Sequence, residues 1–312
     1  MKTRNHLIIY GVMTALGLTA AYSSAGADDR TTTTTRETST YQRTSSKMND
    51  KTLGDLEKAN KLIGKTVMSS DNQKLGKVED IIVDLESGRA LYAVVVSGGI
   101  LGAGEKRFAV APGAFTETQG SDAHLNIDKA KFQAAPEFTK EIDKDTELGK
   151  ADFVNQVYQY FGQPAWWQGG NAAPNAGSFH NVHKASEVVG MKVHNVSNED
   201  IGKVDNVIID LPAGRVVYVI LSPDRSLSLG DNLYAFPPNA LTLSSDRKFL
   251  VTDINKDRLA AAPHFPKNTW PNLADTSWAS QVYQYHGKQA YFQTGMQPTS
   301  ERDKERIYPD KK

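Results

Sequence analysis

The chain has 312 residues, with 36 basic and 36 acidic side chains, no cysteine and 39% hydrophobic residues. A formal net charge of zero argues against electrostatic binding to nucleic acid or to an anionic membrane surface. The lack of cysteine excludes disulfides, thiolate metal sites and cysteine nucleophiles. At roughly 100–200 residues per domain, the length predicts two domains.

Residues 1–27 have the pattern of an export signal. Lys2 and Arg4 supply the positive start, residues 7–22 carry no charge, and residues 25–27 are small, as a signal peptidase requires. The uncharged stretch is shorter than the roughly 20 residues that span a bilayer. We therefore expect cleavage after Ala27, no integral membrane segment afterwards, and a periplasmic or extracellular location. Retention of the segment as an anchor is the alternative.

Three segments have compositions typical of disordered chain. Residues 28–53 are rich in Ser and Thr, residues 168–183 form a linker rich in Gly, Asn and Ala, and residues 294–312 form a charged tail. Such segments bury too little apolar surface to offset the entropy of ordering them. Two folded units remain, at 54–167 and 184–293.

The two predicted units are copies of each other. A shift of 126 positions aligns residues 61–115 with residues 187–241, with 17 identities in 55 positions, whereas average composition gives roughly 3 or 4 by chance. At a shift of 125, residues 156–160 and 281–285 share the sequence Gln-Val-Tyr-Gln-Tyr. The chain therefore carries an internal duplication.

Each repeat is predicted to be mainly β. Residues 75–84 and 90–97 are rich in Val and Ile, and they flank a turn in which Gly88 supplies a positive φ. Gly214 occupies the equivalent turn of the second repeat. Several short strands with glycine turns favour a small barrel or sandwich. Further strands are expected at 65–69, 107–111, 123–127, 191–196, 232–236 and 249–253.

A short amphipathic helix is predicted at the end of each repeat. Phe153, Val157 and Phe161 are spaced by four residues in the first repeat, and Trp278 and Val282 repeat this spacing in the second. Apolar residues at this spacing share one face of a helix. Such a helix can cover the open end of a barrel.

A set of turn and core motifs resembles the PRC-barrel domain, which is named for part of the photosynthetic reaction centre H subunit. The resemblance covers residues 61–138 and, with fewer motifs, residues 187–265. It implies a small, strongly bent β-barrel that binds other macromolecules, and no shared catalytic residue. The motifs are Ile63-Gly64, Leu75-Gly76-Lys77-Val78, Asp84 with Gly88-Arg89, the glycine-rich run at 98–104, and Phe108-Ala109-Val110-Ala111-Pro112.

Two aspartates and six glycines are predicted to build turns. Asp84 and Asp210 precede equivalent hairpin turns, where aspartate accepts hydrogen bonds from backbone N–H groups; an acid–base role is the alternative. A strand follows the glycine-rich run, whereas a phosphate-binding loop leads into a helix. The predicted turn residues are Asp84, Gly88, Gly98, Gly99, Gly102, Gly104, Asp210 and Gly214.

His180 and His183 form the histidine pair with a metal-ligand spacing, and His194 is a third candidate. Histidines three residues apart on a helix can hold zinc or nickel. This pair, however, lies at the edge of the predicted linker without cysteine support. We expect no metal and no cofactor, and a metal-dependent hydrolase is a minor alternative.

Aromatic residues gather near the end of each repeat. Exposed aromatics can stack on sugar rings or anchor a protein partner, because they bury much area for few frozen torsions. Packing against the barrel core is the alternative. The predicted contact surface consists of Tyr158, Tyr160, Trp166, Trp167, Tyr283, Tyr285, Tyr291 and Phe292.

The leading hypothesis is an exported, non-catalytic interaction or scaffolding module of the bacterial envelope. Its protein partner is unidentified, and self-association into a homo-oligomer stays open. Binding of a polysaccharide or a small anionic molecule is the first alternative. Resemblance to the reaction centre subunit implies a role near membrane electron transfer as a further alternative. The expected absence of that subunit's long membrane anchor argues against it.

Overall fold

The computed structural model describes residues 53–98, 104–165, 179 and 181–293. The predicted export signal, the Ser/Thr-rich segment up to residue 52 and the charged tail lie outside the described residues, as do Gly99, Gly102, Trp166, Trp167 and His180. In the described part of the chain, no helix is long and apolar enough to cross a membrane.

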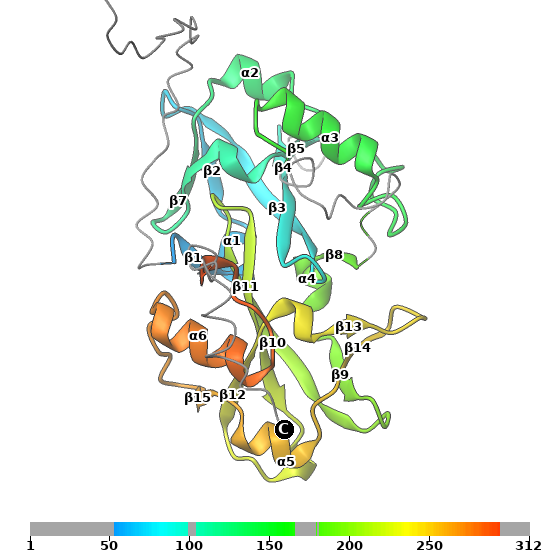
Figure 1. Ribbon diagram of the computed structural model, residues 1–312. Helices are drawn as coiled ribbons and strands as arrows, with labels where there is room; N and C mark the ends of the chain where they lie inside the picture. Colours follow the sequence, from blue (N-terminus) through cyan, green and yellow to red (C-terminus); the bar gives the residue numbers. More distant parts are fainter. Residues whose placement is uncertain (1–52, 99–103, 166–178, 180, 294–312) are drawn as a thin grey trace, which may run out of the picture. The chain divides into compact units, whose positions relative to one another are not determined.

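The first repeat is built around the long hairpin of β3 and β4, with two helices later in the chain (Figure 1). Its strands are β1 (Leu56–Lys58), β2 (Thr66–Met68), β3 (Lys74–Asp84), β4 (Arg89–Ser97), β5 (Lys106–Val110), β6 (Phe115–Glu117) and β7 (Asp122–Leu125). Its helices are α1 (Ala59–Leu62), the 3-10 turn η1 (Pro112–Ala114), α2 (Lys129–Gln133) and α3 (Ala151–Tyr160).

The second repeat follows the same order around the hairpin of β10 and β11. Its strands are β8 (Val182–Lys184), β9 (Lys192–Asn195), β10 (Asp200–Asp210), β11 (Arg215–Pro223), β12 (Asn232–Phe236), β13 (Thr242–Leu243), β14 (Phe249–Thr252) and β15 (His264–Pro266). Its helices are α4 (Ala185–Val188), α5 (Lys256–Ala261), α6 (Thr276–Tyr285) and the 3-10 turns η2 (Arg225–Leu227), η3 (Pro238–Ala240) and η4 (Tyr291–Gln293). The second repeat thus starts two residues before the predicted boundary.

The mainly β fold and the helix at the end of each repeat are confirmed.

One glycine in each central hairpin allows the strands to approach closely. A Cβ atom on Gly76 would lie 2.1 Å from the backbone oxygen of Val96, and one on Gly202 would lie 2.2 Å from that of Ser222. Only glycine fits at either position, because real Cβ atoms do not approach other atoms this closely.

The two repeats exchange their first strands. β1 of the first repeat pairs with β10 of the second, and β8 of the second repeat pairs with β3 of the first. Together with a contact between β4 and β11, these pairings join all strands into a single sheet of 15 strands. Two barrels in tandem were predicted, with their mutual packing left open. The described residues of both repeats form one shared sheet, which is not closed.

Each central hairpin carries a buried tyrosine that holds the loop before the terminal helix. The Tyr92 hydroxyl donates to the backbone oxygen of Leu148 at 2.9 Å, and the equivalent Tyr218 hydroxyl donates to that of Leu273 at 3.1 Å. Both rings are fully buried. A buried hydroxyl needs such a partner, so these bonds fix how α3 and α6 approach the sheet.

Candidate functional site

Arg89 and Arg215 mark the centre of the junction between the repeats. They are equivalent residues, and they lie opposite each other where β4 meets β11. The Ala90 N–H donates to the Gly214 oxygen at 3.2 Å, and the Val216 N–H donates to the Gly88 oxygen at 3.1 Å. This reciprocal pair of bonds relates the two repeats by local two-fold symmetry.

The two arginines lie in a partly buried environment. Burial, and then the charge of Arg215, lower the pKa of Arg89 to about 10, so its guanidinium group stays charged at neutral pH. Burial also lowers the pKa of Arg215. The Arg215 guanidinium lies over the Tyr291 ring, 4.2 Å from its centroid. A cation over an aromatic face is stabilised by the ring quadrupole.

The hairpin turns on either side of this centre contact the opposite repeat. Gly88 and Gly214 have φ values of 63° and 61°, in the left-handed region that favours glycine. A Cβ atom on Gly88 would lie 3.2 Å from Pro238, and one on Gly214 would lie 3.3 Å from Pro112. The predicted turn glycines therefore also belong to the contact between the repeats.

Asp84 and Asp210 lie at the start of these turns. Asp84 accepts hydrogen bonds from the Glu86 N–H at 3.2 Å and from the Ser87 hydroxyl at 2.5 Å. Asp210 accepts a hydrogen bond from the Ala213 N–H at 3.1 Å. Burial raises the pKa of both carboxyl groups.

In the glycine-rich run at 98–104, the predicted turn residues Gly98 and Gly104 have positive φ.

A buried carboxylate that was not predicted joins α4, which follows the exchanged strand β8, to the host strand β3. Asp80 in β3 accepts hydrogen bonds from the N–H of Ser186 at 3.2 Å and from the Ser186 hydroxyl. The Ile81 N–H donates to the same carboxylate at 2.8 Å. Burial raises the pKa of Asp80, although these hydrogen bonds oppose it. The available signal was a pair of acidic residues, Glu79 and Asp80, between Val78 and the apolar residues 81–83.

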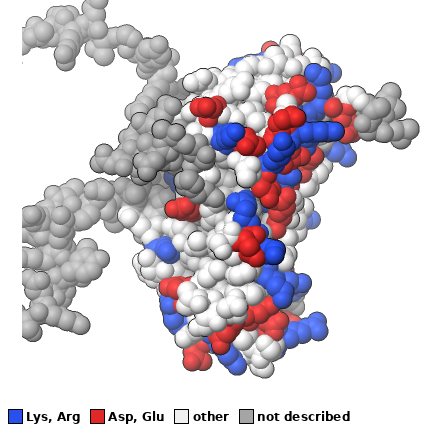
Figure 2. Space-filling view, turned by 90° about the vertical axis from the view of Figure 1, so that its right-hand side faces the viewer, with Lys and Arg blue, Asp and Glu red and all other residues white. Residues whose placement is uncertain are grey.

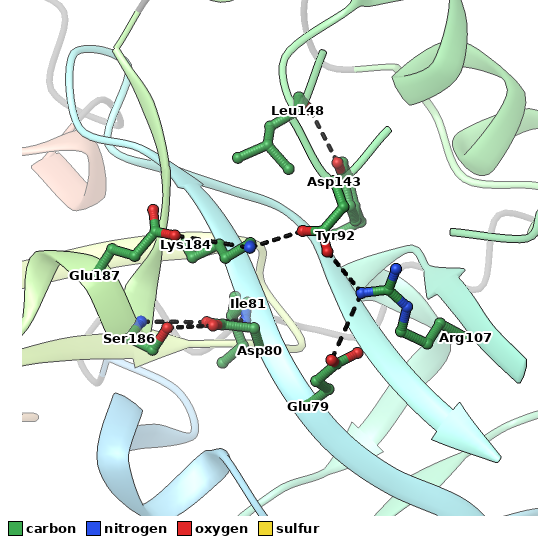
Figure 3. A network of polar contacts seen from close by, with 10 residues as sticks. All are labelled: Glu79, Asp80, Ile81, Tyr92, Arg107, Asp143, Leu148, Lys184, Ser186 and Glu187. Atoms are coloured by element: carbon green, nitrogen blue, oxygen red, sulfur yellow. Dashed lines mark hydrogen bonds and ion pairs between the residues drawn. The ribbon is translucent and has the colours of Figure 1, made fainter. Parts of the chain in front are cut away.

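A network of ion pairs lies beside this contact (Figure 3). Asp143 of the first repeat lies 2.6 Å from Lys184 Nζ of the second and 2.7 Å from Arg107 Nη1. Lys184 also lies 3.6 Å from Glu187, and Arg107 lies 3.6 Å from Glu79. Burial tends to raise the pKa of Asp143, but its contacts with Lys184 and Arg107 lower it overall.

The first repeat uses its equivalent lysine in another way. Lys58, at the end of β1, is the equivalent of Lys184 and lies 3.3 Å from the centroid of the Trp270 ring. Both exchanged strands thus end in a lysine whose charge is held by the opposite repeat, through an ion pair in one case and a cation–π contact in the other. No sequence motif distinguishes these lysines.

The aromatic residues predicted as a contact surface make contacts within the chain. Tyr158 and Tyr283 are buried, and the Tyr283 hydroxyl donates to the Val217 oxygen at 3.0 Å. The Tyr160 hydroxyl donates to the Lys131 oxygen.

The remaining aromatic residues of the second repeat follow the same pattern. The Tyr285 hydroxyl donates to the Arg258 oxygen, and Tyr291 lies under Arg215. Phe292 packs edge-on against Tyr283, with ring centroids 5.7 Å apart. Tyr160 and Tyr285 therefore join the terminal helices to α2 and α5, and Tyr283 joins α6 to strand β11.

The histidines considered as metal ligands occupy separate environments. His183 in β8 is 3% exposed, and burial, with help from Arg247, lowers its pKa to about 4. His194 stacks on Phe249, with ring centroids 4.4 Å apart. Among the described residues, no three histidine or acidic side chains are grouped as metal ligands.

The PRC-barrel domain model matches residues 54–130 and 180–259. The chain belongs to the PRC-barrel family. The two matches are consistent with PRC repeats in tandem, and the second match starts at residue 180, just before the exchanged strand β8. No curated protein matches the chain.

Opposite charges are mixed on the surface of the PRC repeats. On the face drawn in Figure 2, Lys and Arg side chains alternate with Asp and Glu in a band beside a largely uncharged area. This pattern agrees with the zero net charge of the chain. Such a surface provides short-range ion pairs rather than long-range attraction to a highly charged polymer.

Proposed function

We propose that this tandem PRC-barrel protein is a non-catalytic interaction and scaffolding module of the bacterial envelope. The observation that carries the proposal is the reciprocal exchange of β1 and β8. It joins two related repeats into one sheet, so that a surface on one repeat keeps a fixed relation to its equivalent on the other.

A fixed pair of related surfaces suits a scaffold. When a partner has contacted one repeat, its second contact is intramolecular and gains from a high effective concentration. The buried aspartates and described aromatics already serve turns, strand contacts and helix packing. Partner binding is therefore assigned to the polar surface with mixed charges (Figure 2), and the envelope location to the predicted export signal.

In-cell crosslinking tests this proposal. The full chain with a small C-terminal tag is expressed in its native cells, crosslinked with a lysine-reactive reagent in intact envelopes, and recovered for mass spectrometry. We expect one enriched envelope protein with crosslinks to lysines of both repeats. A cytoplasmic location of the tagged chain, or crosslinks to no other protein, would contradict the proposal.

A further inference from the structure

A polar pocket of about 570 Å³ lies where the β3–β4 turn of the first repeat meets the β13–β14 hairpin of the second. Its lining includes Glu86 from the first repeat, and Asn181, Leu241, Leu243 and Arg247 from the second. The volume falls in the range of small-molecule sites. None of these residues was singled out by the sequence.

The pocket occurs where the two repeats differ. In the first repeat, Asp55 accepts hydrogen bonds from the N–H and hydroxyl groups of Thr118, at 2.5 and 2.8 Å. The equivalent residues of the second repeat are Asn181 and Ser244. Ser244 donates its hydroxyl to Asp246 at 2.7 Å instead. A contact that ties the first repeat together is thus replaced in the second by an open pocket between Asn181 and the hairpin.

Two polar groups in the pocket wall lack partners. Asn181 is 6% exposed, and its Oδ1 accepts no hydrogen bond from a described residue. Nε of Arg247 is buried and also has no partner among the described residues. The guanidinium is held at its other end, because Nη2 donates to the Val182 oxygen at 2.8 Å. Burying an unpaired acceptor and an unpaired donor costs free energy. A ligand recovers it only after these side chains move, because both atoms are closed to solvent.

The charges around the pocket define the chemistry of that ligand. The charged residues of the lining are Arg247, a cation, and Glu86, an exposed anion that forms no ion pair with a described residue. A carboxylate fits the guanidinium, and an ammonium group fits Glu86 together with Asn181 Oδ1. Leu241 and Leu243 supply apolar surface beside them.

We propose that this pocket binds a free α-amino acid with an apolar side chain. The carboxylate of the amino acid contacts Arg247 after the half-buried guanidinium rotates away from the Val182 oxygen, and its ammonium group contacts Glu86 and Asn181. The inference does not depend on the scaffolding function, because it rests on one pocket and its unpaired groups.

Calorimetry with matched ligands tests the proposal on the unaltered full chain. The probes are L-leucine, D-leucine, leucinamide, which lacks the carboxylate, and 4-methylpentanoate, which lacks the ammonium group. At least one leucine enantiomer should bind with a stoichiometry of one. Each analogue should bind about tenfold more weakly or worse, because it loses one set of charge-assisted hydrogen bonds. The proposal would be overturned if either analogue bound as tightly as leucine, or if neither leucine enantiomer bound.

Matched variants test whether leucine binds in this pocket. Arg247→Gln and Glu86→Gln should each weaken leucine binding about tenfold or more. Lys248→Gln, next to Arg247, and Glu105→Gln, an exposed carboxylate before β5, should leave it unchanged. Thermal melting by circular dichroism verifies that each variant is folded. Wild-type affinity in both pocket variants would place the ligand elsewhere and refute the inference.

Discussion

Asp80 and Ser186 are 106 positions apart, yet the carboxylate of Asp80 accepts hydrogen bonds from both the N–H and the hydroxyl of Ser186. The bond joins the host strand β3 of one repeat to the segment that follows the exchanged strand β8 of the other. These hydrogen bonds therefore connect the two copies of the duplicated sequence within the sheet that they share.

Removal of this carboxylate should destabilise the protein. Asp80→Ala removes the acceptor of the buried Ile81 N–H and of the N–H and hydroxyl of the exposed Ser186. The loss of an acceptor in a buried site costs about 1–3 kcal/mol. Asp80→Asn should cost less, because the second repeat already has Asn206 at the equivalent position. The measurement is urea unfolding followed by circular dichroism. Asp145→Ala, which removes an exposed carboxylate, is the control; an equal loss in the control would show that only net charge matters.

The turn glycines at the junction should be equally sensitive in both repeats. An alanine at Gly88 or Gly214 must adopt a positive φ, and its Cβ meets a proline of the opposite repeat at 3.2 or 3.3 Å. Each substitution should cost about 1–2 kcal/mol from the backbone strain alone.

Urea midpoints of the two glycine variants measure this cost. Gly120→Ala is the control, because its Cβ would lie no closer than 3.8 Å to the nearest atom. If one junction variant were as stable as the wild type while the other was not, the reciprocal contact between the repeats would be disproved.

His183 should make the stability depend on pH in mild acid. Burial lowers its pKa from 6.5 to about 4, so the unfolded chain binds a proton at a higher pH than the folded chain. The stabilisation is complete above pH 6.5, is lost as the pH falls toward 4, and amounts to roughly 3 kcal/mol at most. The raised pKa values of Asp80, Asp84 and Asp210 act in the opposite sense.

Because these effects overlap, the difference between wild type and His183→Gln is the informative quantity. Urea unfolding at pH 7 and pH 4.5 should show a smaller acid-induced loss in the variant. His124→Gln, at a partly exposed position in β7, serves as the control. Identical pH profiles for wild type and His183→Gln would refute the prediction.

The sequence predicted the parts of the fold that depend on local patterns. Segments rich in Val and Ile on either side of a glycine turn predicted β3 and β4, and the duplication extended this to β10 and β11. The four-residue spacing of apolar residues predicted α3 and α6. Gly88 and Gly214 were predicted because a hairpin turn needs a positive φ.

The exchange of strands was not predicted, for a physical reason. β1 and β8 contain three residues each, which is too few for a periodic signal. Each pairs with a strand more than 90 positions away in the chain, so no local pattern predicts the pairing. The network around Asp143 was missed likewise, because Asp143 lies in a loop without any motif. The pocket at Arg247 depends on a contact that one repeat makes and the other lacks.

The most direct test of the shared sheet uses the absence of cysteine from the chain. Arg89→Cys and Arg215→Cys are introduced together in the full chain, where they face each other as a pair without mutual backbone hydrogen bonds. Such pairs have the closest side chains in an antiparallel sheet, which suits a disulfide. Mild oxidation followed by non-reducing peptide mapping should give an intrachain disulfide in nearly all of the monomer. A reduced pair, or disulfides between chains only, would show that the repeats do not meet at this point.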